Sequence, residues 1–210
     1  YFHPQTAQAA VRVLEAAGCR IALPQGHVCC GRPLYDYGML DLAKKYLRGI
    51  VDQLRPQIRA GVPLVGLEPS CVAVFRDELV NLFPSDEDAL RLSHPTYLLS
   101  EWLATINYQP PQLQRKGLFH GHCHQRAIMG IDSDRQLLTN MGIELEVLDS
   151  GCCGMAGSFG FEREHYDISV ACGERVLLPA VRSANPETLI IADGFSCQEQ
   201  IRQLTGGTAL

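Results

Sequence analysis

The feature of this sequence that most restricts its fold is an internal repeat built around a Cys-Cys-Gly triplet. The segment AAGCRIALPQGHVCCG (16–31) parallels NMGIELEVLDSGCCG (140–154), and VPLVGLEPSC (62–71) parallels ETLIIADGFSC (187–197). In both copies an apolar strand runs into a turn that carries cysteine. Two copies in the same order indicate that one α/β unit has been duplicated along the chain.

The hydrophobic pattern predicts short strands and amphipathic helices in alternation. The expected strands lie at 19–24, 62–67, 117–121, 144–149 and 188–193. The expected helices lie at 5–17, 38–54, 133–141 and 163–178, with two more that begin near Cys71 and Cys197. Pro56 is expected to bend or end the helix at 38–54. Alternation of this kind gives parallel sheets with right-handed crossovers, so we predict an α/β fold of two pseudo-symmetric units with short parallel sheets.

The repeat also divides the chain. We expect a first copy at 1–83, a second copy at 116–210, and between them a linker at 84–115 that holds a helix at 96–106. The first copy lacks a counterpart of Cys123, which would fall just before the first residue, so we expect this copy to be truncated at its N-terminus. The opening letters YFHPQ read as the interior of an element, which predicts a fragment of a longer protein.

Composition narrows the classes of function. Apolar residues make up 46% and charged residues 20% of the chain, the balance of an ordinary globular protein. The net charge is −5 and no basic run is present, so nucleic acid is not an expected partner. Apolar runs such as TLIIA (188–192) are too short to span a bilayer, and no signal-peptide pattern is present. We predict a cytoplasmic protein without a transmembrane segment, either free or peripheral at the inner face of the membrane.

The nine cysteines are the candidate chemical groups. An odd number with two vicinal pairs argues against a disulfide framework and favours metal binding or redox chemistry. In the second copy, Cys123, the pair Cys152 and Cys153, and Cys197 each follow an expected strand. Because the carboxyl ends of parallel strands meet at one edge of a sheet, we expect these four thiols to converge.

Four converging thiolates suit either a tetrahedral Zn²⁺ or a 4Fe–4S cluster. Adjacent cysteines can face one centre only where the backbone turns, and Gly151 and Gly154 permit that turn. Neighbouring thiols can bind different irons of a cluster, whereas a single zinc makes a tighter demand on a vicinal pair. The pattern therefore favours the iron–sulfur cluster, and zinc remains the alternative.

The first copy offers three thiols, from Cys29, Cys30 and Cys71. They form a possible second metal site, either as zinc ligands together with a histidine such as His27, as a vestigial site, or as a metal-free lining of the binding face. Cys19 and Cys172 alternate or align with apolar residues, so both are expected in the core.

The sequence HGHCHQ places His120, His122 and His124 on one face of the expected strand and Cys123 on the other. His122 and His124, together with Gly154, are expected to surround the cluster and hydrogen-bond its sulfurs, and a second metal site on the histidines is the alternative. His120 is expected to be structural. No Ser-His-Asp order or paired acid and base indicates hydrolysis, and we expect no catalytic residue in this chain.

The motifs CCGRP and CCGMAGSFG, with HGHCHQ before and Ser-Cys after the second, resemble the duplicated cysteine-rich CCG domain. That domain occurs in heterodisulfide reductases, in the iron–sulfur subunits of glycolate and lactate oxidation systems, and at the C-terminus of FAD-linked oxidases, which this chain resembles most. Full members carry a Cys-x-x-Cys motif, in which Glu68 and Gly194 here replace the first cysteine. The five-cysteine pattern that heterodisulfide reductases use for unusual clusters is therefore missing, which argues against that activity.

The resemblance implies an electron-transfer module with a 4Fe–4S cluster, in a flavin-dependent dehydrogenase of a 2-hydroxy acid such as D-lactate, glycolate or D-2-hydroxyglutarate. It implies FAD-binding and ferredoxin-like domains in the same longer chain, and a quinone or another carrier as electron acceptor. The fragment alone would not be catalytic. Two other hypotheses remain: a zinc-stapled scaffold that docks other domains, and a component that reduces disulfides or heterodisulfides with its thiols.

Overall fold

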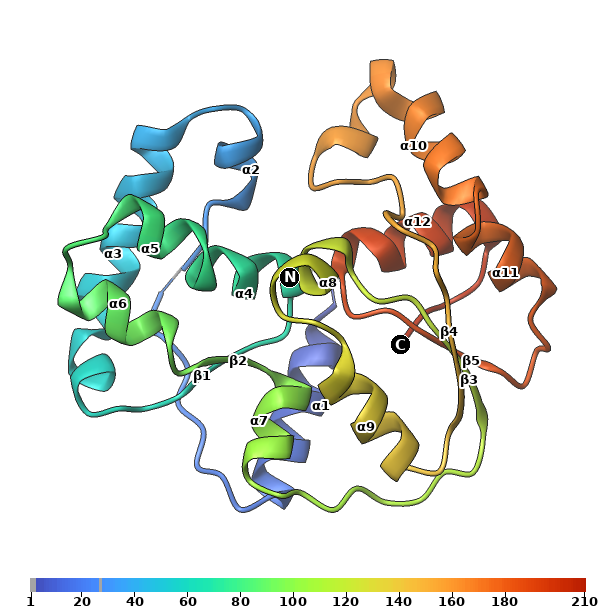
Figure 1. Cartoon of the computed structure of the whole chain (residues 1–210), viewed down its shortest axis with the longest axis horizontal. Coiled ribbons are helices and arrows are strands. Elements are labelled where there is room, and N and C mark those ends of the chain that lie inside the picture. The colour runs from blue at the N-terminus through green and yellow to red at the C-terminus, as the bar shows by residue number, and fades with distance from the viewer. Residues whose placement is uncertain (1–2, 27) are drawn as a thin grey trace. The chain divides into compact units, whose positions relative to one another are not determined.

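The computed structural model describes residues 3–26 and 28–210, and these form two compact units (Figure 1). Unit 1 contains the described residues up to Leu67 together with Cys71–Tyr108, and unit 2 contains Glu68–Ser70 and Gln109–Leu210. Each unit contains a short parallel sheet with helices, as the repeat predicts. The predicted α/β class is therefore confirmed.

Unit 1 is mainly helical. Its sheet pairs β1 (Leu64–Gly66) with β2 (Thr96–Leu98) in parallel. Its core lies along one face of the long helix α3, where buried apolar side chains such as Leu47 and Val51 pack with Val74 and Leu79. Its helices are α1 (Pro4–Ala16), α2 (Arg32–Asp36), α3 (Leu40–Arg59), most of α4 (Pro69–Arg76), α5 (Glu78–Leu82), α6 (Glu87–Ser93) and α7 (Leu99–Thr105).

One local prediction for unit 1 is wrong, and two others need correction. Residues 19–24 form no strand, because this segment lacks a buried face and Leu23 is 77% exposed. The expected helix at 96–106 begins instead as β2, and only α7 is helical. Of the two effects expected of Pro56, an end to the helix is excluded, because α3 continues to Arg59, where its buried face outweighs one missing N–H.

Unit 2 has a three-stranded parallel sheet in the order β4-β3-β5, from β4 (Glu144–Val147), β3 (Lys116–Phe119) and β5 (Leu189–Ile191). Neighbouring residues of β3 point to opposite faces of this sheet. Its helices are α8 (Cys123–Ile128), α9 (Asp132–Asn140), α10 (Tyr166–Glu174), α11 (Leu177–Ser183) and α12 (Phe195–Thr205), with 3-10 turns η1 (Phe159–Phe161) and η2 (Arg163–His165).

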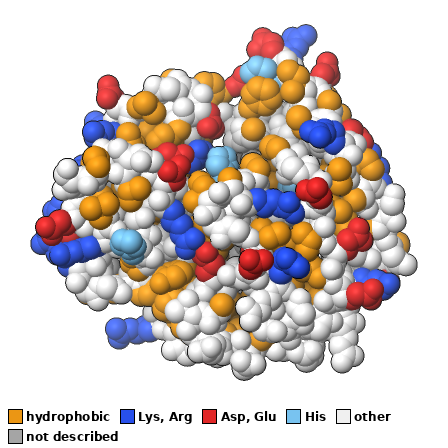
Figure 2. Space-filling view, in the orientation of Figure 1, with side chains coloured by type: hydrophobic (Ala, Val, Ile, Leu, Met, Phe, Trp, Pro, Cys, Tyr) orange, Lys and Arg blue, Asp and Glu red, His pale blue; other side chains and the backbone are white. Residues whose placement is uncertain are grey.

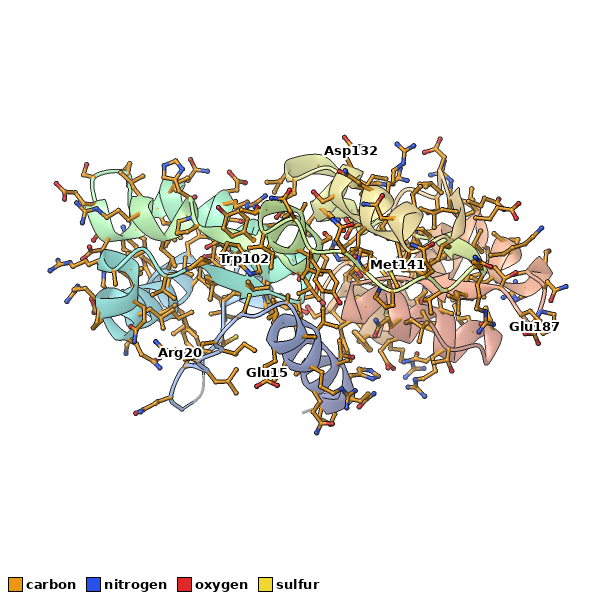
Figure 3. All side chains as sticks on the ribbon, turned by 90° about the horizontal axis from the view of Figure 1, so that it is seen from below. Glu15, Arg20, Trp102, Asp132, Met141 and Glu187 are labelled. Atoms are coloured by element: carbon orange, nitrogen blue, oxygen red, sulfur yellow. The ribbon has the colours of Figure 1, made fainter. Side chains whose placement is uncertain are left out.

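Helices cover both faces of this sheet at its central strand β3, whereas the edge strand β4 keeps exposed Glu144 and Glu146. Phe119 packs on one face with Leu138 of α9, and Leu118 packs on the other with Leu177 of α11 and Ile201 of α12. Figure 3 shows α9 on one side of the sheet and the C-terminal helices on the other. The sheet is thus held between two apolar clusters, with only its edges open.

The expected helix at 163–178 is divided into η2, α10 and α11. Pro179 explains the break between α10 and α11. In one continuous helix Pro179 would lack its N–H and would clash with the preceding turn, whereas in the first turn of a new helix its N–H is not needed. The restart also places Leu177 and Leu178 in the core.

The distribution of charged side chains on the surface of the described residues agrees with a composition that has no basic run. On the face shown in Figure 2, acidic and basic side chains are interspersed. Among the described residues, none of the helices has both the length and the apolar character needed to cross a bilayer.

Candidate metal centre

The three strands of unit 2 each lead directly into a cysteine-bearing segment. After β3 the chain reaches Cys123, the first residue of α8. After β4 it enters the loop that carries Cys152 and Cys153, and after β5 it reaches Cys197 in the first turn of α12. The predicted placement of cysteines at the carboxyl ends of the strands is confirmed, and the ends of α8 and α12 that carry thiols are those that favour thiolate.

The structure brings the four thiols of this edge together. Each of these thiols lies close enough to its neighbours to shift their pKa values: Cys152 interacts with Cys123 and with Cys153, and Cys153 interacts with Cys197, whose sulfur lies within 4.8 Å of its own. Cys153 and Cys197 are almost fully buried, while Cys123 and Cys152 are half-buried. The sulfurs thus form a continuous chain that runs from the accessible edge of the site into the core.

Because these thiols lie close together, the pKa values of some are lowered and those of others are raised. The hydrogen bonds from Cys123 and Cys153 lower the pKa of Cys152 to about 2, and the same bonds raise the pKa of Cys123 and of Cys153. The bond from Cys153 lowers the pKa of Cys197 to about 5, although burial opposes this. Four thiolates in contact repel one another unless a cation lies among them. The donor set is therefore suited to a cationic centre.

His120 also belongs to this site. Its ring is 1% exposed, its Nδ1 lies 2.6 Å from Ser150 Oγ, and one ring nitrogen lies within 4.8 Å of the Cys153 and Cys197 sulfurs. After Cys153, His120 also lowers the pKa of Cys197 through a side-chain hydrogen bond, although its Nε2 meets no partner at strict hydrogen-bond geometry among the described residues. A buried ring nitrogen beside two thiols could donate to a sulfur of a bound group.

The pattern of the sequence predicts only a structural role for His120. Its place directly after the last residue of β3 is the signal that could have identified it. The strand expected at 117–121 ends at Phe119, so the alternation of faces predicted for the histidines does not apply.

His122 and His124 lie around Cys123. Buried His122 is the N-cap of α8, where its Nδ1 accepts the backbone N–H of His124 at 3.2 Å. Burial lowers the pKa of His122. The two imidazoles stack with centroids 5.4 Å apart, and ligand atoms of both rings lie within 4.8 Å of the Cys123 sulfur. Their expected role toward a cluster stays a prediction.

The turn at the vicinal pair requires glycine at one position in particular. Gly154 has a φ of +103° and donates its N–H to Cys152 Sγ at 3.3 Å. A Cβ at this position would lie 2.0 Å from the carbonyl oxygen of Ser169 in α10. Gly151 also has a positive φ, of +64°, but no atom lies within 4 Å of a Cβ there.

The two positions that depart from the Cys-x-x-Cys pattern have defined contacts in unit 2. A Cβ on Gly194 would lie 2.3 Å from His122 Cδ2 and 3.3 Å from Cys197 Sγ. Glu68 Oε2 accepts the backbone N–H of Phe195, the first residue of α12, at 2.8 Å. The space for a cysteine side chain at 194 is thus taken by the His122 ring.

We expect Gly194→Cys to lower the free energy of unfolding by about 1–3 kcal/mol, because the new side chain overpacks the His122 ring. Urea unfolding of the reduced protein measures this loss. The double variant Gly194→Cys/His122→Ala provides the control, since removing the ring restores the space and should make the two effects strongly non-additive. Simple addition of the two losses would contradict the assignment of the clash to His122.

The three candidate ligands of unit 1 are not all brought together. Cys30 Sγ lies 3.0 Å from Cys71 Sγ, and Cys30 is buried in the core of the unit. Among the described residues, Cys29 belongs to no group of three clustered ligands, and the His27 prediction falls outside these residues.

Cys19 and Cys172, expected in the core, are half-buried.

Comparison with known proteins identifies the family. The family description "CCG: Cysteine-rich domain" matches residues 1–76 and 119–202. These matches contain both Cys-Cys-Gly triplets and both Ser-Cys motifs. The chain therefore belongs to the CCG cysteine-rich domain family, and the resemblance drawn from the motifs is confirmed.

The individual relatives include two dehydrogenase proteins and a lactate utilization protein. One subunit of the anaerobic glycerol-3-phosphate dehydrogenase of Escherichia coli is 32% identical over 98% of this chain and 52% of its own length. Lactate utilization protein A of Bacillus licheniformis is 29% identical over 82% of the chain and 77% of its own length. D-2-hydroxyglutarate dehydrogenase of E. coli is 27% identical over 98% of the chain but only 20% of its own length. The chain spans about half the length of the first of these relatives.

Proposed function

We propose that unit 2 holds a 4Fe–4S cluster on Cys123, Cys152, Cys153 and Cys197, and that the chain is the iron–sulfur electron-transfer module of a flavin-dependent system that oxidises a 2-hydroxy acid. One observation supports this proposal: four thiols that follow three strand ends interact in the order Cys123, Cys152, Cys153 and Cys197. A bound cluster would accept and release single electrons.

The residues of the site fit such a group. The four sulfurs are soft donors, and two of them are buried in an apolar cluster that includes Met155 and Leu148. His120 Nε2 is a buried polar atom that a cluster sulfur could satisfy. Low solvent access and a nearby donor are two of the means by which a protein sets the reduction potential of a cluster.

The vicinal pair favours a cluster over a single zinc, because neighbouring thiols can bind different irons whereas one zinc makes a tighter demand on them. Cys152 interacts with both Cys123 and Cys153, and Cys153 also interacts with Cys197. A zinc-stapled scaffold remains the outcome to exclude by experiment.

The names of the relatives support a role in dehydrogenase systems. Two of the names refer to 2-hydroxy acids, lactate and D-2-hydroxyglutarate, whereas the third refers to glycerol 3-phosphate, which is not one. By this proposal the chain acts beside an FAD-binding domain and a ferredoxin-like domain of a longer protein, on the cytoplasmic side. It receives electrons originating from D-lactate, glycolate or D-2-hydroxyglutarate and passes them to a quinone or another carrier. The chain itself binds and insulates the redox centre and performs no bond-making chemistry.

Anaerobic reconstitution with iron and sulfide, followed by EPR after reduction, tests this function. We expect a spectrum typical of a reduced 4Fe–4S cluster. Stoichiometric zinc in freshly prepared protein, with no iron bound after reconstitution, would instead support the zinc-stapled scaffold.

One observation in unit 1 favours a second candidate function, thiol–disulfide exchange. The sulfurs of Cys30 and Cys71 lie 3.0 Å apart. Joining them would give two electrons and two protons to a disulfide substrate, which would leave as two thiols. Counting free thiols with and without reductant tests this, and Cys30→Ser should remove the reducible pair whereas Cys29→Ser should not.

A further inference from the structure

Gln200 of α12 is a buried polar side chain that contacts the vicinal-cysteine loop. It is 2% exposed, and its Nε2 donates to the backbone carbonyl of Cys153 at 3.0 Å. The same Nε2 also donates to Ser169 of α10, to the carbonyl at 3.0 Å and to Oγ at 3.2 Å. One amide group therefore joins α12, α10 and the loop.

Cys197 and Gln200 are three residues apart on α12, so they lie on the same face of the helix. From this face the Cys197 thiol meets the Cys153 thiol, and the Gln200 amide meets the Cys153 carbonyl. Helix α12 thus holds both the side chain and the main chain of one cysteine.

Small residues seat the loop against α10 at the same place. A Cβ at Gly160 would lie 2.5 Å from Ser169 Oγ, and a Cβ at Gly173 would lie 3.0 Å from the Cys153 carbonyl oxygen. Together with Gly154, these residues let the loop approach the helix closely enough for Gln200 to reach it. The loop and the amide are therefore fitted to one another, since a shift of the loop would break the bond to Cys153.

We infer that Gln200 is a positioning residue of the metal centre, which fixes the Cys153 sulfur relative to the Cys197 sulfur. This inference rests on the proposed cluster. Gln200 contacts no ligand sulfur by its hydrogen bonds and acts through the main chain of Cys153. Without its donor, two buried carbonyls lose a partner and the loop gains freedom to move away from α12.

A merely structural role would also destabilise the fold, so the test needs a readout at the cluster. Gln200→Met keeps the length of the side chain and removes its donor. The matched control is Gln198→Met, which removes a bond of 2.7 Å from the same helix to the Ala192 carbonyl without touching the loop. In reconstituted protein, the rate at which an iron chelator bleaches the cluster absorbance is measured, together with the EPR spectrum of the reduced cluster.

We expect Gln200→Met to lose its cluster at least about tenfold faster than wild type and to show an altered EPR spectrum. Gln198→Met should match wild type in both. Equal rates and spectra for wild type and Gln200→Met would overturn the inference alone. A wild-type protein that takes up no cluster would overturn the proposed function, and this inference with it. If Gln200→Met does not fold, Gln200→Leu, which likewise lacks the donor, takes its place, with the same expected result and the same overturning result.

Discussion

Replacing Cys153 by serine is expected to abolish stable binding of the cluster, with iron content after reconstitution falling below about a tenth of the wild-type value. Cys153 is the central link of the thiol chain, because it contacts both Cys152 and Cys197. It is 3% exposed, so no water can readily replace a missing ligand. Iron and acid-labile sulfide per protein chain are the quantities to measure.

Cys19→Ser is the control for this experiment, since Cys19 lies in unit 1 and outside the thiol cluster. It should leave the iron content of wild type unchanged. Full iron content and an unchanged spectrum in Cys153→Ser would remove Cys153 from the ligand set.

Gly154→Ala is the second substitution with a large expected effect. The new methyl group would lie 2.0 Å from the Ser169 carbonyl oxygen and 2.9 Å from its carbon. Both atoms are main chain of α10 and cannot rotate away, and the φ of +103° is itself unfavourable for alanine. We expect a loss of about 3 kcal/mol or more in the free energy of unfolding, together with loss of the cluster.

Gly151→Ala separates the steric effect from the cost of the backbone conformation. Gly151 has a φ of +64°, but nothing lies within 4 Å of a Cβ there. This variant should lose only about 1 kcal/mol and keep its cluster. Urea unfolding of the reduced, cluster-free proteins compares the two, and equal losses would show that the contact with Ser169 is not the cause.

The convergence of the four thiols could be predicted because it depends only on strand order along the chain. In a parallel sheet every strand ends at the same edge, so cysteines that follow β3, β4 and β5 must approach one another. The role of the glycines beside the vicinal pair could likewise be predicted, since Cys152 and Cys153 can bind one metal centre only if the backbone turns there.

What the pattern missed depends on side-chain contacts across the sequence. Alternation in HGHCHQ suggested a strand, but the chain leaves the sheet after Phe119, and His120 rather than its neighbours lies beside Cys153 and Cys197. The His122 ring fills the space beside Gly194, and the Gln200 amide contacts the Cys153 carbonyl. Both contacts join residues that are distant along the chain. Local periodicity contains no information on such contacts.

The predictions of individual strands and helices failed where burial and the local sequence pattern disagree. Residues 19–24 alternate like a strand, but none of them is buried and Leu23 is 77% exposed. The helix expected at 163–178 is broken before its end, and α11 restarts at Leu177 with Pro179 in its first turn, which lets Leu177 enter the core. In both places tertiary burial, rather than the period of the sequence, decides the structure.

The central claim is that the four thiols of unit 2 hold a 4Fe–4S cluster. The most direct test is the iron, zinc and acid-labile sulfide content of the full-length protein purified without oxygen, measured beside a variant in which Cys123, Cys152, Cys153 and Cys197 are all serine. We predict that wild type exceeds the variant by about four irons and about four sulfides per chain. Equal iron in the two proteins, or a difference of one zinc and no sulfide, would contradict the claim.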